Sequence, residues 1–495
     1  MLEPDRSYPG LKARFVALDA TQEILEPRID GCLAWPAVKR RVWNAIRRQH
    51  EGAAGTGPAA PGKVAVRFVA GLAAILRHLV LPPRRRVAVL YSPRQSRRAD
   101  GTMVHPHLDT LVHHERSVLH CAYGWGGSRA AVGRGYVAEH GIAAVVAIAA
   151  RVVAMSPSIQ LTAAKLALSI AVRFPEAAGA VGLDVIADQL ARFRVRRWLY
   201  RLLFARSGVR AVAVTDAGGK TGEVAAAKSL GLPVVEVQHG MFSHDEPDYA
   251  WVRAHRGSGR AMPLPDAIIV FGPLWRRELA RNEYWRDQEI LLASNPILVS
   301  YRRGAPVRRR ERESPLVVLF ATQWYVRSDA IAFLGAALDL QRRSGSRVFQ
   351  LRVKLHPAEL AAERDYAALA GTFPEDCVLA PAATEAFAEI LQADLVAGYT
   401  SMMLLEAIGL GVPALSIATG AGKEGFCTAF GIEELRDVVP EVDTPARFIE
   451  RLRAMSQPEA WRAARAAAGK AASAIYTLDG CTVEQAFMDA TGVHP

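Results

Sequence analysis

The chain has 495 residues, of which 51% are hydrophobic and 22% charged, and its formal net charge is +12. This composition is typical of a globular protein and argues against the disordered and collagen-like classes. Five widely spaced cysteines without a CxxC pair argue against a disulfide framework or a zinc ribbon, so we expect a reducing, cytoplasmic environment. The longest apolar run, Ile142–Ala150, is shorter than the roughly 20 residues of a membrane span. It predicts a buried helix.

The basic excess is local, at Arg84–Arg86, Arg194–Arg201 and Arg302–Arg312. Nucleic-acid binding is the least favoured interpretation, because the clusters carry no interleaved aromatic residues and no recognition motif. A solvated surface and a peripheral contact with anionic membrane lipids both remain open.

The first 80 residues form a helical N-terminal extension in this interpretation, with amphipathic helices predicted over Ala37–Gln49 and Val64–Leu79. From Val87 onward, short apolar strands alternate with helices, which is typical of a doubly wound parallel sheet. The strands predicted in this half are Val87–Tyr91, Ala211–Thr215, Pro233–Val237, Ala267–Phe271 and Ile290–Ala293.

A basic, polar segment, Tyr301–Ser314, interrupts this rhythm and is predicted to be the linker between two domains. A second α/β series follows, with strands predicted at Leu316–Ala321, Phe349–Leu355, Cys377–Ala380, Leu395–Ala397 and Pro413–Ile417. We therefore predict an α/β protein with two Rossmann-like domains, residues 81–300 and 315–456, that face each other across a cleft. C-terminal helices in residues 457–495 are expected to pack back toward the first domain.

Ligands of open α/β sheets bind beyond the carboxyl ends of the strands, so the residues that follow each predicted strand are candidate site residues. In the first half these candidates are Ser92, Asp216, Gln238, His239, Gly240 and Asn295. In the second half they are Gln323, His356, Thr400 and Ser401, together with Lys354 near a strand end.

The segment GYTSMMLLEAIGLG places Thr400 and Ser401 at the predicted start of a helix. Hydroxyls and backbone N–H groups there favour an anion such as a phosphate, and the carboxylate of Glu406 is placed to accept hydrogen bonds from ribose hydroxyls. A capped helix with a solvent-facing glutamate is an equally good interpretation. His356, before Pro357, either donates to a phosphate oxygen or is a structural histidine at a strand end.

His239 is a candidate general base, because an unperturbed imidazole pKa of about 6.5 lies near working pH. Asp216 is the rival base, and the glycines after it are also compatible with a nucleotide-binding turn. No two aspartates stand at DxD spacing. This argues against a required divalent cation, and we assign no metal ligands.

The QHG turn at Gln238–Gly240, the HP pair at His356, and the hydroxyl pair Thr400–Ser401 followed by Glu406 resemble GT-B-fold bacterial glycosyltransferases of capsule and lipopolysaccharide biosynthesis. The HP and hydroxyl-pair motifs are similar to those of bacterial sialyl-, polysialyl- and Kdo-transferases. The two histidines are also similar to those of CDP-glycerol glycerophosphotransferases. This chain departs from the sialyltransferases in having Thr-Ser rather than Ser-Ser and a single acid in TDAGG.

The resemblance implies that His356, Thr400 and Ser401 hold the donor phosphate, that Glu406 holds the ribose, and that His239 is catalytic. It further implies that residues 81–300 bind an acceptor and residues 315–456 the nucleotide donor. The remaining cleft candidates carry no assigned role.

We therefore expect a metal-independent glycosyltransferase without a cofactor. It would move a sugar from a nucleotide-sugar donor to a growing surface polysaccharide or lipid-linked glycan. The expected location is the cytoplasm, at the inner face of the cytoplasmic membrane, with no nucleic-acid partner. The alternatives are a CDP-glycerol-type glycerophosphotransferase, a sugar 2-epimerase of similar fold, and a non-catalytic nucleotide-binding component of a polysaccharide assembly complex.

Overall fold

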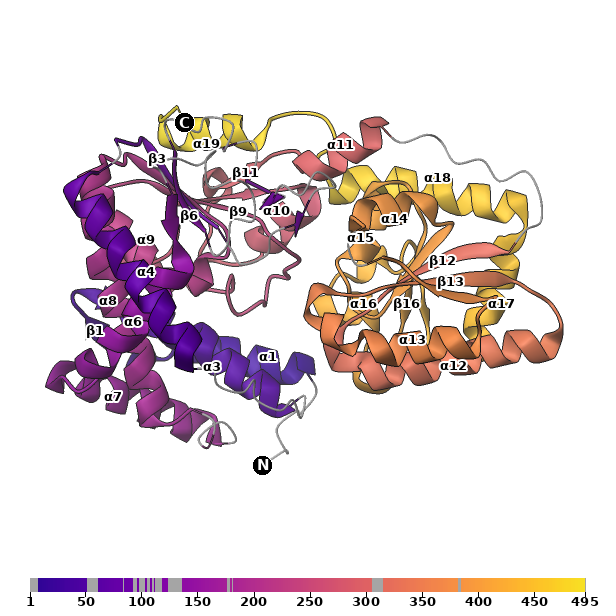
Figure 1. Cartoon of the computed structure of the whole chain (residues 1–495), viewed down its shortest axis with the longest axis horizontal. Coiled ribbons are helices and arrows are strands. Elements are labelled where there is room, and N and C mark those ends of the chain that lie inside the picture. Colours follow the sequence, from indigo (N-terminus) through magenta and orange to yellow (C-terminus); the bar gives the residue numbers. More distant parts are fainter. Residues whose placement is uncertain are drawn as a thin grey trace.

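The structure is a computed structural model. It describes residues 8–50, 61–82, 84–91, 118–122, 136–175, 181–304, 315–381 and 384–494, and the short stretches 96–97, 103–104, 107–108, 111 and 179. Two parallel sheets dominate it, one in each half of the chain (Figure 1). The predicted fold class, two Rossmann-like domains in series, is confirmed.

The first sheet has seven strands in the order β11-β10-β9-β8-β3-β6-β7, and every neighbouring pair is parallel. Its central strands β3 and β8 are continuous apolar runs, β9 is apolar except for Glu236, and all three are buried, as expected when helices cover both sides of a parallel sheet. The strand bounds are β3 Val87–Leu90, β6 Val118–Ala122, β7 Tyr136–Ala138, β8 Ala211–Val214, β9 Val234–Val237, β10 Ala267–Val270 and β11 Ile290–Leu292.

The second sheet has six parallel strands in the order β14-β13-β12-β15-β16-β17. Their bounds are β12 Leu316–Ala321, β13 Phe349–Lys354, β14 Cys377–Leu379, β15 Leu395–Gly398, β16 Ala414–Ile417 and β17 Glu441–Val442. In both sheets the chain starts at a central strand, proceeds to one edge, and returns to the other side of that strand. The direction reverses between β3 and β8 in the first sheet and between β12 and β15 in the second.

Helices surround the two sheets. In the first half they are α1 Tyr8–Ala17, α3 Trp35–His50, α4 Pro61–Val80, α6 Glu139–Val153, α7 Pro157–Arg173, α8 Leu183–Ser207, α9 Thr221–Ser229, α10 Pro273–Ala280 and α11 Pro296–Gly304. In the second half they are α12 Arg327–Ser344, α13 Glu363–Thr372, α14 Ala386–Gln392, α15 Met403–Gly409, α16 Gly425–Phe430, α17 Pro445–Ser456, α18 Pro458–Ile475 and α19 Val483–Thr491.

The N-terminal helices are part of the first domain's core. Phe15 of α1 and Trp35 of α3 are fully buried in the same hydrophobic cluster as the strand residues Val235 and Ile268. A second contact, Trp43 beside Phe15 at 5.1 Å between ring centroids, joins α3 to α1. Residues 8–50 therefore fold against the first sheet rather than as a separate unit.

The C-terminal segment crosses back from the second domain to the first. Helix α18 packs on α15 of the second domain, whereas α19 lies on β9 and β10 of the first (Figure 1). Between these helices, the N–H of Thr477 donates to Phe271 O at 2.8 Å, and the N–H of Ser294 donates to Cys481 O at 2.9 Å. Gly272 lies so close to this crossing that a Cβ there would be 2.0 Å from the Ile475 carbonyl oxygen.

Some sequence-based expectations need correction. The predicted linker begins inside a helix, because Tyr301–Gly304 is the last turn of α11, and residues 305–314 lie outside the described part. Tyr301 stacks on Phe387 of α14 and donates a hydrogen bond to Glu385. The predicted helix at Ser401 starts later, at Met403. In the two large sheets three strands were not predicted: β6, which pairs with β3, β7, which pairs with β6, and the edge strand β17.

Candidate functional site

Asp216 lies at the topological switch point of the first sheet, directly after β8. Its backbone is in the left-handed region, with φ at +64° and ψ at +53°, one of two such non-glycine residues in the described chain. Aspartate is among the residues that tolerate this conformation, which costs energy for most side chains. The turn is fixed from the neighbouring strand, because Glu236 of β9 accepts a hydrogen bond from the Ala217 N–H at 3.2 Å.

The side chain of Asp216 lies between two basic groups. Arg40 of α3 donates a hydrogen bond to it, and His239 Nε2 lies 3.7 Å from Asp216 Oδ1. Burial alone would raise the pKa of Asp216, but the charges of His239 and Arg40 and the hydrogen bond from Arg40 lower it below its ordinary value. Asp216 is therefore held ionised, which favours a role in orienting His239 over a role as the proton acceptor.

Arg40 also approaches Asp248, with Nε 3.6 Å from Oδ2. Two lysines of the N-terminal segment reach the same loop after β9. Lys12 Nζ lies 2.8 Å from Asp245 Oδ1, and Lys39 Nζ donates to the Ala250 carbonyl at 2.7 Å. The N-terminal helices thus anchor the acidic loop that begins at His239 through two ion pairs and one hydrogen bond.

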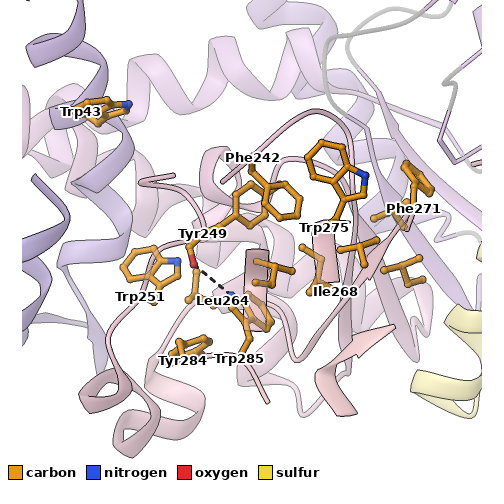
Figure 2. Close-up of a cluster of buried hydrophobic side chains, with 14 of the residues drawn as sticks. Trp43, Phe242, Tyr249, Trp251, Leu264, Ile268, Phe271, Trp275, Tyr284 and Trp285 are labelled. Atoms are coloured by element: carbon orange, nitrogen blue, oxygen red, sulfur yellow. Dashed lines mark hydrogen bonds between the residues drawn. The ribbon is translucent and has the colours of Figure 1, made fainter. Parts of the chain in front are cut away.

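An aromatic cluster supports this loop from within the domain (Figure 2). Phe242 packs on Tyr249 at 4.4 Å and on Trp275 at 5.5 Å between ring centroids. The Tyr249 carbonyl accepts hydrogen bonds from the side chains of Asn282 at 2.8 Å and Trp285 at 3.4 Å. The loop therefore has a fixed path, which holds His239 near Asp216.

The loop also reaches the second domain. A Cβ added at Gly431, which follows α16, would lie 3.5 Å from His244 Cε1. Nearby, Arg277 of α10 forms an ion pair with Glu434 at 3.1 Å. The loops that follow β9 and β16 therefore meet, which brings the carboxyl edges of the two sheets toward each other.

At the switch point of the second sheet, Thr400 is fixed by residues that follow β12. Its N–H donates to Gln323 Oε1 at 2.8 Å, and its hydroxyl accepts from Gln323 Nε2 at 3.3 Å. Tyr325 forms a further hydrogen bond with the same hydroxyl. Ser401 accepts from the Met403 N–H at 3.3 Å and is half-buried at the start of α15. Because Thr400 is bound by protein groups, it positions the turn, and Ser401 is the more available of the two hydroxyls.

His356 is exposed at the end of β13, on the same edge of the sheet. Its N–H donates to Thr322 Oγ1 at 2.8 Å, which ties the HP turn to the end of β12. Strand β12 lies between β13 and β15, so His356 and Ser401 follow strands that are not neighbours in the sheet. Two strand spacings separate their backbones by roughly 10 Å.

Glu406 lies in the first turn of α15. It is half-buried, and burial raises the pKa of its carboxyl to about 7. The charge of Glu406 in turn contributes to the raised pKa of the fully buried Tyr476, so the two side chains lie close together. Burial thus disfavours the charged form of this carboxyl.

The polar side chains of three other candidates form hydrogen bonds with backbone groups. Gln238 is fully buried, donates to Gly240 O at 2.9 Å and accepts from the Phe271 N–H at 2.8 Å. Asn295 caps α11 by accepting from the N–H groups of Ile297 and Leu298 at 3.1 and 3.2 Å. Lys354 donates to the Pro381 carbonyl at 2.9 Å. These contacts favour positioning over ligand binding.

Gly240 is half-buried beside His239, and Ser92 lies outside the described residues.

Sequence reasoning missed Arg40, Tyr325 and a glycine-rich run. Arg40 is 176 positions from Asp216, so no local pattern connects them. The run Gly420–Gly425 has the spacing GxGxxG directly after β16 and was recognisable from the sequence. Gly420 and Gly422 are needed for close approach, because a Cβ at these positions would lie 2.1 Å from Asp329 Oδ2 and 2.4 Å from the ring of Tyr399.

Within the described residues, no group of three or more His, Cys, Asp or Glu side chains is arranged to hold a metal ion. The predicted roles of the site residues stay predictions.

No family model matches the chain, and no curated protein matches it.

Similar folds occur among solved structures. The glycosyltransferase SsfS6 of Streptomyces sp. SF2575 has 12% identity and a TM-score of 0.41, over 80% of this chain and 97% of that one. The calicheamicin glycosyltransferase CalG4 has 13% identity and a TM-score of 0.42, over 79% and 95%. The UDP-GlcNAc 2-epimerase of Methanocaldococcus jannaschii has 9% identity and a TM-score of 0.35, over 53% and 74%. The similar structures include more than one activity, so the function proposed below depends on the site geometry.

Replacing Arg40 by methionine should destabilise the first domain. The change leaves Asp216 and Asp248 near each other without their shared cation, at a cost of roughly 1–3 kcal/mol in the free energy of unfolding. Urea unfolding at pH 7 measures this cost. The matched control is Arg41→Met, because Arg41 is exposed on the same helix. Equal stability of the two variants would contradict a structural role for Arg40.

Replacing Glu236 by glutamine should change how stability depends on pH. Burial raises the pKa of Glu236 to about 8 from an ordinary value of 4.5. Between pH 4.5 and about 8 the folded state therefore holds a proton that the unfolded state has lost. Over this range the free energy of unfolding of the parent falls by up to ~1.4 kcal/mol per pH unit. The variant lacks this loss, so its stability relative to the parent should increase from pH 5.5 to pH 8.

Urea unfolding at the two pH values measures this difference, with Glu450→Gln, exposed on α17, as the control. A Glu236→Gln stability difference that stays constant with pH would mean that Glu236 ionises normally in the folded protein.

Proposed function

We propose that the chain is an enzyme, a metal-independent glycosyltransferase that uses a nucleotide-sugar donor. The observation that carries the proposal is the pair of switch points. One holds an imidazole beside an ionised carboxylate, and the other gathers hydroxyls and an imidazole at one sheet edge. Loops from the two carboxyl edges meet at His244 and Gly431. An acceptor base on one domain facing a donor site on the other is an arrangement that suits sugar transfer.

In the proposed reaction, His239 takes the proton from an acceptor hydroxyl. The hydroxyl oxygen forms a bond with the anomeric carbon while the bond from that carbon to the donor phosphate breaks. Asp216 stabilises the imidazolium that forms, because it is ionised and lies 3.7 Å from His239 Nε2. Ser401 and His356 donate to the departing phosphate, and Glu406 accepts from the ribose hydroxyls.

The acceptor in this proposal is a growing surface polysaccharide or a lipid-linked glycan at the inner face of the cytoplasmic membrane. A capsule or lipopolysaccharide product rests on the motif resemblance.

Donor binding tests the site in the second domain. Thermal-shift titration with CMP-, CDP-, UDP- and GDP-linked ligands should raise the melting temperature with one base, equally with magnesium and with EDTA, because binding stabilises the folded state. Ser401→Ala and His356→Ala should both weaken this shift, whereas Ser456→Ala on α17 should leave it unchanged. A shift that requires magnesium would contradict metal independence, and no shift with any ligand would contradict the donor site.

His239→Ala tests the proposed base. Loss of general-base assistance should lower turnover by about 10²–10⁴-fold, whereas the donor Kd should stay within about threefold of the parent's because His239 lies on the other domain. His494→Ala, an exposed histidine after α19, is the matched control.

Parent-like turnover of the His239→Ala variant would refute the assignment. The mass of the product separates the alternatives, because a glycerophosphotransferase leaves a phosphodiester, an epimerase needs no acceptor, and a binding component makes no product.

A further inference from the structure

Helix α7 is apolar on both of its faces. One face, Ile159, Ala163, Leu166 and Ile170, is buried in the core of the first domain. The opposite face carries Leu161, Leu168 and Val172, which are 61%, 67% and 70% exposed. A surface helix of a soluble domain normally presents polar side chains outward, so this outer face is unusual.

The apolar surface continues onto α6. Ile148 and Val152 of this helix are 40% and 66% exposed, and Met155, in the short connection to α7, is 70% exposed. We call Ile148, Val152, Met155, Leu161, Leu168 and Val172 the α6–α7 face. Figure 1 shows α7 on the outside of the first domain, on the side away from the second.

No single described helix is long and apolar enough to cross a membrane. Helices α6 and α7 together reach that length and composition, but they are bent by 91° at the connection between them. The inner face of α7 is packed into the domain core, so the helix presents only its outer face. This is the geometry of a helix that lies in a membrane interface rather than spanning it.

The exposed charges on α6 and α7 themselves are all positive. The only acidic residue between positions 139 and 173 is Glu139, which is fully buried. Arg151, Lys165 and Arg173 are exposed on the same two helices. Arg173 is paired with Glu23 at 3.0 Å, whereas Arg151 and Lys165 have no ion-pair partner among the described residues.

Helix α8, which packs on α7, adds an exposed tryptophan, Trp198, at 66% exposure, and the exposed Arg201. Tryptophan is favoured where one end of a ring is in lipid and the other in water. On the same helix Arg194 is paired with Asp30 at 2.9 Å. The apolar side chains therefore lie among cations, which complements an anionic lipid surface.

We propose that the α6–α7 face docks on a bilayer containing anionic phospholipids. Its apolar side chains enter the boundary between headgroups and acyl chains, and Arg151, Lys165 and Arg201 contact lipid phosphates. The inference is independent of the proposed transferase activity, because docking requires neither donor nor acceptor.

Flotation of the full chain with vesicles tests this surface without any nucleotide sugar. The parent should float with vesicles of phosphatidylcholine and phosphatidylglycerol and bind pure phosphatidylcholine about tenfold more weakly. The variant Leu161→Ser/Leu168→Ser/Val172→Ser should lose binding to the anionic vesicles by about tenfold or more. Arg151→Gln/Lys165→Gln should weaken binding at low salt and reduce its salt dependence.

Leu340→Ser/Leu360→Ser removes two exposed leucines of the second domain and should bind like the parent. All replaced side chains are exposed, so melting temperatures should match the parent's and separate lost docking from unfolding. Failure of the parent to float, or undiminished flotation of the triple-serine variant, would overturn the proposal. So would a parent dimer that the triple-serine variant converts to a monomer while vesicle binding persists, because the face would then join two copies.

Discussion

The interaction between Arg40 and Asp216 links the N-terminal helices to the edge of the first sheet. Asp216 occupies a left-handed backbone position at the switch point and is largely removed from water. A carboxylate in that place stays ionised only if a cation compensates for its lost hydration. Arg40 and His239 provide this compensation, and the pKa of Asp216 is lowered despite burial. The path of the loop after β9, and with it the position of His239, depends on the same set of charges.

The second domain follows the same topological rule with different chemistry. Its switch point gathers neutral groups, in which Gln323 and Tyr325 fix Thr400 and leave Ser401 at the start of α15. The nearby run Gly420–Gly425 approaches Asp329 and Tyr399 more closely than any larger residue would allow. One sheet edge thus carries a charged pair suited to moving a proton, and the other carries donors suited to an anion.

Much of the fold could be predicted from the sequence, because buried parallel strands are continuous apolar runs. Strands such as Ala267–Val270 and Leu316–Ala321 were recognisable for that reason. Strands β6 and β7 were not, since β6 contains His120 within its apolar run and β7 has only three residues. β6 pairs with β3 and β7 pairs with β6, and this tertiary pairing leaves no periodic signal in the sequence.

Site residues could be predicted from the sequence where they directly follow a strand that the sequence also predicts. Asp216 and His239 follow strands of the first sheet and lie close together, and Gln323 and Thr400 do the same in the second sheet. The contribution of Arg40 was not predictable, because its partner lies 176 positions away and α3 alone resembles an ordinary amphipathic helix. The outward apolar stripe of α7 was also hidden, since the sequence does not reveal which of two apolar faces the core covers.

A crystal structure of the chain with a bound nucleoside diphosphate tests the central claim most directly. The account places the diphosphate at the switch point between β12 and β15, within hydrogen-bonding reach of Ser401 and His356, with the ribose beside Glu406. A diphosphate bound instead at the turn after β8, against Arg40 and the glycines that follow Asp216, would contradict the account, because the first domain would then hold the donor and His239 could not serve as the acceptor base.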